Sequence, residues 1–247
     1  MLCPAEQKDS YDYPVDTHQE KYPMLLQIDQ LLSTQELSRL NTLLQAGVFE
    51  DGKWTAGIYA KTVKDNQQLV QEGQEYQVAS EIVRSALGRN RLFQTYVQPK
   101  MIGSLLFSRY EAGMAYGTHM DNALMGSGDQ LRRSDLSLTI FLNDPLTYEG
   151  GALVLDTSLG EQYFKLPAGS MIVYPSIFLH RVEAVSKGVR LVAVAWVQSL
   201  IRDPLERELL FELDTVRHSI FEKQGKTVEF DLLCKVYSNL LRKWAEI

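Results

Sequence analysis

The residues of this 247-residue chain whose types and spacing could do chemistry are the tripeptide His119-Met120-Asp121 and a second histidine, His180, 59 residues after Asp121. Two neutral imidazoles and one carboxylate can occupy one face of a ferrous ion and leave the opposite face open for redox chemistry. Because side chains alternate along an extended segment, His119 and Asp121 point to the same side of the chain. A His-X-Asp tripeptide alone is weak evidence, so this interpretation depends on the surrounding sequence.

The segments around both histidines have the pattern of short β-strands. The apolar stretch Leu105–Tyr110 is followed by residues 111–117, whose glycines permit a sharp turn into the segment of His119. Farther along, residues 167–176 predict a turn and then an apolar strand that leads to His180. Both histidines are therefore expected near strand ends, where a fold can bring them together.

Arg190 is the residue that could select a dicarboxylate ligand. Its planar guanidinium can form two parallel hydrogen bonds with a carboxylate, and this pairing is strengthened in a buried site. The flanking Val189 and Leu191 indicate an interior strand rather than a solvent-facing edge. Arg181, next to His180, points to the opposite face of an extended segment, so we expect it to be structural or to lie at the mouth of the site.

Together these motifs closely resemble those of the 2-oxoglutarate- and Fe(II)-dependent dioxygenases of the prolyl 4-hydroxylase type, and within them the PKHD-type hydroxylases. The residues that carry the resemblance are Tyr110, His119-X-Asp121, Glu149-Gly150-Gly151-Ala152-Leu153, His180-Arg181-Val182 and Arg190. The similarity continues through residues 196–203 and covers the chain from about Tyr22 to its C-terminus.

The resemblance implies a double-stranded β-helix, or jelly roll, that encloses Fe(II) and 2-oxoglutarate. It implies that His119, Asp121 and His180 hold the metal. It also implies that Arg190 binds the distal carboxylate of 2-oxoglutarate and that Tyr110 donates a hydrogen bond to the same co-substrate. The expected enzyme is a 2-oxoglutarate-dependent dioxygenase that hydroxylates its substrate and releases succinate and CO2, with L-ascorbate as the reductant that rescues oxidised iron.

The sequence departs from the family pattern at one position. Phe141 stands where some relatives have a tyrosine that helps to hold 2-oxoglutarate, so the identity of the second hydroxyl group that binds the co-substrate is open.

The alternative function is a non-oxidative metal-binding jelly-roll module or sensor, which has no need for a dicarboxylate anchor such as Arg190. Halogenation generally requires the carboxylate ligand to be absent, and Asp121 is present. The substrate is a small molecule or a protein side chain, and the family suggests a link to iron homeostasis.

Composition limits the partners and the compartment. A net charge of −6 argues against a general nucleic-acid binder, which needs an excess of Lys and Arg. No run of 18 or more apolar residues occurs, so no transmembrane helix and no membrane partner is expected. Cys3 and Cys234 are far apart in a chain too long to need a disulfide scaffold. A cytoplasmic location fits both this cysteine usage and ferrous iron.

Periodicity predicts an α+β chain in four parts, which are a polar leader (1–22), an N-terminal strand with supporting helices (23–100), a core of short strands typical of a β-sandwich or barrel (101–198) and a C-terminal helical hairpin (199–247). The resemblance implies that the core is the jelly roll. In the second part Ser33 and Glu36 have the spacing of a capping box at a helix start, and a later helix is expected to stop at Gly88. These helices would buttress the core.

Two further segments have alternative interpretations. The glycine-containing loop Ala123–Arg133 directly follows the ligand pair, so it is either a lid over the substrate or a plain connector. In the C-terminal part, Asp203-Pro204 predicts a helix start, and apolar residues recur at helical spacing on either side of Gly225. Such stripes favour packing within the chain, with a homodimer through this hairpin as the alternative.

Overall fold

The two faces of strand β10 (Leu136–Phe141) contribute side chains to two different apolar regions of the interior. In the computed structural model, which describes residues 25–247, Leu138 and Ile140 belong to a core that includes the helices α1 and α2. Phe141 belongs to a second core of buried residues that lies between two β-sheets. Ser137 and Thr139, on the same face of β10 as Phe141, line a cavity between these sheets. The predicted leader and Cys3 lie outside the described residues.

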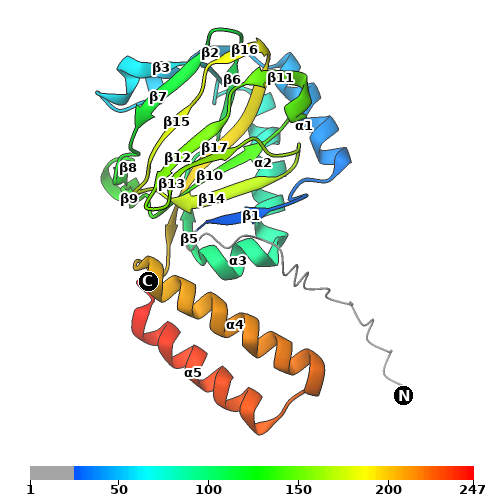
Figure 1. The fold of residues 1–247 in the computed structure, drawn as a ribbon, viewed down its shortest axis with the longest axis vertical. Helices are drawn as coiled ribbons and strands as arrows, with labels where there is room; N and C mark the ends of the chain where they lie inside the picture. The colour runs from blue at the N-terminus through cyan, green and yellow to red at the C-terminus, as the bar shows by residue number, and fades with distance from the viewer. Residues whose placement is uncertain (1–24) are drawn as a thin grey trace.

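The larger sheet has eight antiparallel strands (Figure 1). Along the sheet the order is β1 (Leu26–Ile28), β14 (Met171–Pro175), β10, β17 (Arg190–Ser199), β6 (Leu106–Tyr110), β4 (Gln67–Leu69) and β2 (Phe49–Asp51), with β5 (Pro99–Ile102) also paired to β17. Because β17 lies between β10 and β6, it is an interior strand, as its apolar sequence predicted.

The smaller sheet has five antiparallel strands and faces the larger one. Its order is β13 (Gly160–Phe164), β12 (Leu153–Thr157), β15 (Leu179–Val182), β7 (Ala115–His119) and β3 (Lys64–Asp65). Two short ribbons pair β11 (Tyr148–Gly150) with β16 (Val185–Gly188), and β8 (Leu124–Met125) with β9 (Arg132–Arg133). Two facing antiparallel sheets with a site between them form the jelly roll expected for this α+β chain, which confirms the fold class.

Three helices follow β1 and β4 in the chain and pack against the larger sheet (Figure 1). They are α1 (Thr34–Ala46), α2 (Gln74–Arg89) and α3 (Arg91–Val97). The Ser33 hydroxyl accepts from the Glu36 backbone and the Glu36 carboxylate accepts from the Ser33 backbone, which confirms the capping box. The predicted stop at Gly88 is wrong by one residue, because α2 continues to Arg89 and the Asn90 side chain then caps α3.

The segment from β2 to β4 was not predicted to contain strands, yet it connects the two sheets. It includes the short 3-10 helices η1 (Gly52–Thr55) and η2 (Ala60–Val63). Strand β4 pairs with β6 of the larger sheet, whereas β3, only one residue before β4, pairs with β7 of the smaller sheet. This segment therefore closes one side of the space between the sheets.

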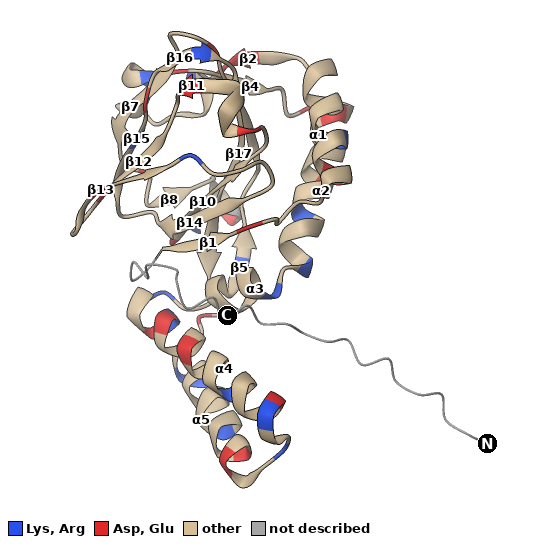
Figure 2. Cartoon of the chain, turned by 45° about the vertical axis from the view of Figure 1, so that its right-hand side comes forward, with Lys and Arg blue, Asp and Glu red and all other residues tan. Residues whose placement is uncertain are grey.

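The C-terminal helices α4 (Pro204–Gln224) and α5 (Val228–Trp244) form the expected hairpin, which projects beyond the sheets and bears charged residues of both signs (Figure 2). Asp203 caps α4, as predicted. The hairpin packs against α3, where the ring of Tyr96 meets the ring of Phe211 of α4 edge to face, with ring centroids 5.3 Å apart. Within residues 25–247, none of the helices has the length and apolar composition that crossing a membrane requires.

Candidate active site

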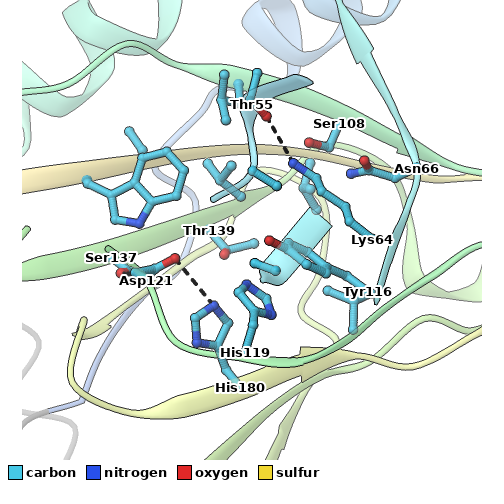
Figure 3. Close-up of a pocket in the computed structure, with 18 of the residues that line it drawn as sticks. Thr55, Lys64, Asn66, Ser108, Tyr116, His119, Asp121, Ser137, Thr139 and His180 are labelled. Carbon is cyan, nitrogen blue, oxygen red and sulfur yellow. Dashed lines mark hydrogen bonds and ion pairs between the residues drawn. The ribbon is translucent and has the colours of Figure 1, made fainter. Parts of the chain in front are cut away.

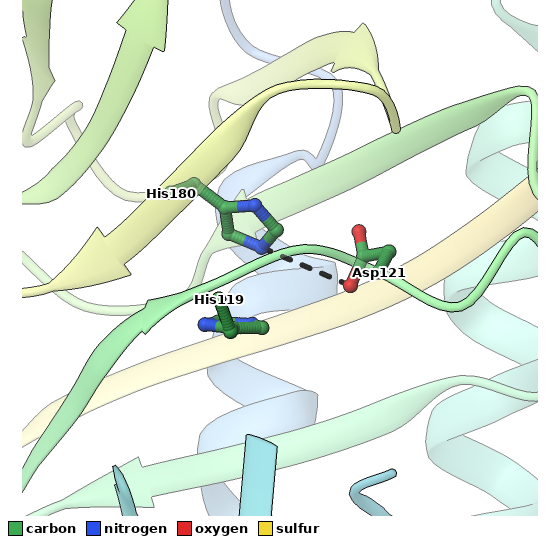
Figure 4. Close-up of side chains that lie close together, drawn as sticks. All are labelled: His119, Asp121 and His180. Carbon is green, nitrogen blue, oxygen red and sulfur yellow. Dashed lines mark ion pairs between the residues drawn. The ribbon is translucent and has the colours of Figure 1, made fainter. Parts of the chain in front are cut away.

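His119 and His180 lie opposite each other on neighbouring antiparallel strands. His119 ends β7 and His180 lies in β15, and the two are register partners. Asp121 follows β7 by two residues, so its carboxylate reaches back beside both rings (Figure 4). One potential ligand atom from each of the three side chains lies within 4.8 Å of the other two. The structure thus brings together the three residues that the sequence singled out for a metal.

Hydrogen bonds to the backbone decide which ring nitrogens are available. The Nδ1 of His119 lies 2.8 Å from the carbonyl oxygen of Gly117, and the Nδ1 of His180 lies 3.0 Å from that of Phe178. A carbonyl only accepts, so each Nδ1 bears the proton and donates it. Each Nε2 is then unprotonated and available to a metal, the usual consequence of such a bond at the other nitrogen.

The carboxylate of Asp121 is oriented by a serine on the larger sheet. The Ser137 hydroxyl donates to its Oδ2 at 2.6 Å and lies 2.7 Å from the Ser176 hydroxyl. The other oxygen, Oδ1, lies 3.8 Å from Nε2 of His180. One carboxylate oxygen is therefore held by the protein, while the second faces the two imidazoles as a ligand would.

Electrostatics favour the metal-binding form of His119. Burial lowers the pKa of His119 from 6.5 to about 4, and the neighbouring His180 contributes to the same shift. The ring of His119 is also fixed by Tyr116, which stacks on it with ring centroids 3.6 Å apart. Metal binding requires neutral imidazole, so this environment keeps His119 ready for a cation at neutral pH.

Arg190, at the start of β17, is buried inside the jelly roll with only 1% of its surface exposed. It is the register partner of Tyr110 on β6, and its guanidinium carbon lies 5.1 Å from the centre of the Tyr110 ring. Its Nε and Nη1 make no hydrogen bond of good geometry with described residues. Burial lowers the pKa of Arg190, because the charged form loses its hydration there. A buried guanidinium with free donors fits an anionic ligand such as a carboxylate.

The Glu149-Gly150-Gly151 motif has a steric role beside Arg190. Gly151 has a φ of +66°, and a Cβ there would lie 3.1 Å from the Arg190 side chain and 3.2 Å from the ring of Tyr148. Tyr148 is buried, and its hydroxyl, like the Arg190 donors, lacks a partner of good geometry among the described residues. Phe141 offers only its ring, 5.7 Å from the guanidinium carbon. Tyr148, not singled out from the sequence, is thus a candidate for the open hydroxyl position.

One cavity of about 350 Å³ is lined both by the metal group and by Arg190. Figure 3 shows the metal group and part of the lining. His119, Asp121, His180, Tyr110 and Arg190 all line this cavity. Its volume falls within the range typical of small-molecule sites, which is roughly 300 to 1,000 Å³. The space therefore fits a small dicarboxylate together with a substrate group of side-chain size.

Two other predicted features, Arg181 and the segment Ala123–Arg133, can be placed relative to this cavity. Arg181 points away from it and pairs with the exposed Glu161, with Nη2 and Oε2 2.9 Å apart, as expected for a structural residue. The segment Ala123–Arg133 contains the β8–β9 ribbon and the 3-10 helix η3 (Gly128–Gln130), rather than a loop without structure. Its residues Leu124 and Met125 line the mouth of the cavity.

Sequence reasoning missed the polar wall that faces the metal group. Lys64, Asn66 and Gln68, all nearly fully buried, line the cavity from β3, β4 and the residue between these strands. Burial lowers the pKa of Lys64 to about 8, although Asp121 and Asp51 oppose the shift. No signal for this wall exists in the sequence, because residues 64–68 are all polar and such a run indicates a solvated loop rather than a strand.

Comparison with known proteins agrees with this geometry. Residues 105–198 match the family described as the 2OG-Fe(II) oxygenase superfamily. The fold and site thus define a 2-oxoglutarate-dependent dioxygenase, an enzyme class that uses Fe(II) and 2-oxoglutarate. Residues 205–246, which form the α4–α5 hairpin, match the PKHD-type hydroxylase C-terminal domain.

Full-length relatives specify the family. A PKHD-type hydroxylase of Thermosynechococcus vestitus is 90% identical over 91% of this chain and 100% of its own length. A PKHD-type hydroxylase of Rippkaea orientalis is 56% identical over 90% of this chain and 100% of its own length. The chain belongs to the PKHD-type hydroxylase family.

Solved structures support the fold. A prolyl-4-hydroxylase from Pseudomonas putida superimposes with a TM-score of 0.51 at 19% identity, over 72% of this chain and 94% of that one. A prolyl hydroxylase from Trichoplax adhaerens, solved with a hypoxia inducible factor peptide fragment, gives a TM-score of 0.51 at 17% identity, over 76% of this chain and 87% of that one. At this level of identity the likeness shows a shared jelly-roll architecture.

Proposed function

We propose that this hydroxylase holds Fe(II) through Nε2 of His119, Nε2 of His180 and Oδ1 of Asp121, and binds 2-oxoglutarate between the metal and Arg190. The donor set is the one that suits ferrous iron with open coordination positions. The residues fit the group, because both imidazoles present an unprotonated nitrogen and Asp121 has one oxygen free of the Ser137 bond.

The single observation that carries the proposal is the buried Arg190 with unpaired donors in the same cavity as the metal group. A buried cation without a counter-charge is costly, so a site that retains one is built for an anion. The distal carboxylate of 2-oxoglutarate would pair with the guanidinium, and Tyr110 and Tyr148, whose rings lie near Arg190, would donate hydrogen bonds to it. The alternative, a non-oxidative metal-binding module or sensor, gives no reason for Arg190 to be there.

When bound, Fe(II) and 2-oxoglutarate supply the oxidative chemistry, in which O2 is consumed, succinate and CO2 are released, and one oxygen atom enters the substrate. The protein contributes position and environment. His119 and His180 are fixed by their backbone hydrogen bonds, Asp121 by Ser137, and Arg190 by its place in an interior strand. The two sheets enclose His180 and Arg190, which are buried, so water would have limited access to that part of the site.

Several parts of the proposal rest on the family resemblance or on composition. They are L-ascorbate as the reductant that maintains ferrous iron, a link to iron homeostasis, and a cytoplasmic enzyme without nucleic-acid or membrane partners. The substrate is a small molecule or a protein side chain. A homodimer through the α4–α5 hairpin is supported by exposed apolar residues on both helices, among them Leu205 at 63% and Val228 at 73% exposure.

Anaerobic titration tests the proposed site. Fe(II) should bind with a stoichiometry of one per chain, and adding 2-oxoglutarate should produce a metal-to-ligand charge-transfer band in the visible spectrum. After admission of O2, succinate should form from 2-oxoglutarate, and faster in the presence of the true substrate. Stoichiometric iron binding without any charge-transfer band would instead support the non-oxidative module.

A further inference from the structure

Lys64 places a buried cation in the active-site cavity, and the mechanism proposed above does not use it. Only 4% of its surface is exposed. Its Nζ donates to the Thr55 hydroxyl at 3.0 Å and lies 5.2 Å from the centre of the Tyr116 ring. Because Tyr116 stacks on His119, one aromatic ring separates this amine from a proposed iron ligand (Figure 3).

No carboxylate of the described residues forms an ion pair with Lys64, whose polar contact is the neutral Thr55 hydroxyl. Asp121 and Asp51 act on the amine only over a distance. In the proposed function Asp121 would be bound to Fe(II), and the positive charge of the metal would oppose the attraction between Asp121 and Lys64. A buried ammonium without an anion is unfavourable, which indicates that its partner arrives with a ligand.

The charges of the loaded site can be compared. Of the Asp, Glu, Lys and Arg side chains that line the cavity, Asp121 contributes one negative charge, while Arg190 and Lys64 contribute one positive charge each. The ferrous ion and the 2-oxoglutarate dianion cancel each other. The loaded site therefore retains one positive charge, and a substrate with one negative group would balance it.

The neighbours of Lys64 are neutral hydrogen-bonding groups. Asn66 is 2% exposed, and neither its amide nitrogen nor its amide oxygen has a partner of good geometry among the described residues. Gly52 makes room for this amide, because a Cβ at Gly52 would lie 1.9 Å from Asn66 Oδ1. One cation with an adjacent free amide suits a carboxylate, whereas a phosphate dianion would favour further cations.

We propose that Lys64 and Asn66 form a recess that binds a carboxylate of the primary substrate beside the iron site. This inference rests on the proposed function and deepens it by naming a substrate class. The substrate carries a carboxylate near the carbon that is hydroxylated, either as a free small acid or as an acidic side chain of a protein. Lys64 and Asn66 are then specificity-determining residues, and Arg190 is left to the co-substrate.

The test uses the anaerobic protein loaded with Fe(II) and saturating 2-oxoglutarate, at constant ionic strength. Propionate and propionamide are matched probes that differ in charge, and their binding is followed by changes in the charge-transfer band. Wild type should bind propionate at least 10-fold more tightly than propionamide, roughly the effect of one charge-assisted hydrogen bond. Lys64→Met should abolish this preference, and the matched control Lys61→Met, at an exposed lysine of η2, should retain it.

Two further measurements separate this role from others. Lys64→Met should leave the affinity for 2-oxoglutarate unchanged. The midpoint of thermal unfolding should stay the same or rise, because the substitution removes a buried charge that has no ion-pair partner. Comparing free L-glutamate with N-acetyl-L-glutamic acid N-methylamide distinguishes a free acid from a protein side chain, and tighter binding of either supports the recess.

Equal binding of propionate and propionamide to wild type, or no propionate binding at all, would overturn the proposal. A fall in 2-oxoglutarate affinity in Lys64→Met would assign Lys64 to the co-substrate instead. Absence of the charge-transfer band in wild type is a different result, because it contradicts the proposed function itself.

Discussion

His119 and His180 are separated by 60 residues of sequence, yet they are register partners on β7 and β15 with ring centroids 4.2 Å apart. Each ring donates its Nδ1 proton to the backbone carbonyl two residues earlier in the chain. The backbone of two paired strands therefore fixes both the position and the tautomer of each imidazole. Such a pair is preorganised for a metal and needs little rearrangement on binding.

The pairing predicts the behaviour of His180→Ala. This variant should lose stoichiometric Fe(II) binding and 2-oxoglutarate turnover, because two ligands cannot replace the set of three. Its circular dichroism spectrum should match that of wild type, since the sheets pack through apolar residues. His218→Ala, at a histidine of α4 outside the cavity, is the control and should bind one Fe(II) per chain. Unchanged iron affinity in His180→Ala would remove His180 from the site.

Arg190 predicts a selective effect on the co-substrate. Loss of a charge-assisted hydrogen-bonded partner costs about 1.5 to 3 kcal/mol, or roughly 10- to 150-fold in affinity. Arg190→Ala should weaken 2-oxoglutarate binding at least this much in the anaerobic titration, with iron affinity nearly constant. Arg190→Lys should retain more 2-oxoglutarate affinity than Arg190→Ala but less than wild type, because an ammonium cannot form the two parallel hydrogen bonds of a guanidinium. Arg181→Ala, at the arginine paired with Glu161, should bind the co-substrate like wild type.

Replacing Tyr148 should weaken 2-oxoglutarate binding less than replacing Arg190 does, without destabilising the metal-free protein. Its buried hydroxyl has no partner of good geometry in the described residues, so Tyr148→Phe should not lower the free energy of unfolding of the metal-free protein. If the hydroxyl binds 2-oxoglutarate, co-substrate affinity should fall about 2- to 12-fold, the range for one net hydrogen bond. Wild-type affinity together with a lower unfolding free energy would indicate a purely structural hydroxyl.

Stability of the metal-free protein should depend on pH through His119. Its pKa is lowered to about 4 in the folded protein, against an ordinary value of 6.5. Between these values the unfolded chain binds a proton that the folded protein does not, so the free energy of unfolding falls as the pH decreases. The slope reaches at most about 1.4 kcal/mol per pH unit for one such group. Urea unfolding between pH 7 and pH 5 measures it, and His119→Asn should flatten the dependence.

The segment Ala123–Arg133 predicts a change in protease sensitivity if it closes over the substrate. Leu124 and Met125 line the cavity mouth, and both are at least partly exposed in the present state. Trypsin cleavage after Arg132 or Arg133 should slow when Fe(II), 2-oxoglutarate and a substrate analogue are added together. Equal cleavage rates in both states would favour a plain connector.

The sequence by itself indicated a core of short β-strands, the capped helices and the three candidate ligands, whereas the jelly roll followed from the family resemblance. These features depend on local rules, because strand and helix periods, capping residues and ligand spacing are all written along the chain. The interior position of Arg190 was also predictable, since apolar residues flank it on a strand that proved to lie between two others. The resemblance to PKHD-type hydroxylases added the co-substrate.

Only the tertiary structure shows which residues line the cavity opposite the three proposed metal ligands. Lys64 and Asn66 lie in a polar segment with no strand signal, and they enter the cavity because β3 and β4 pair with different sheets. Likewise, Tyr148 approaches Arg190 because Gly151 leaves room for both side chains. Such contacts join residues far apart in the chain, and they follow from strand pairing and steric fit rather than from local periodicity.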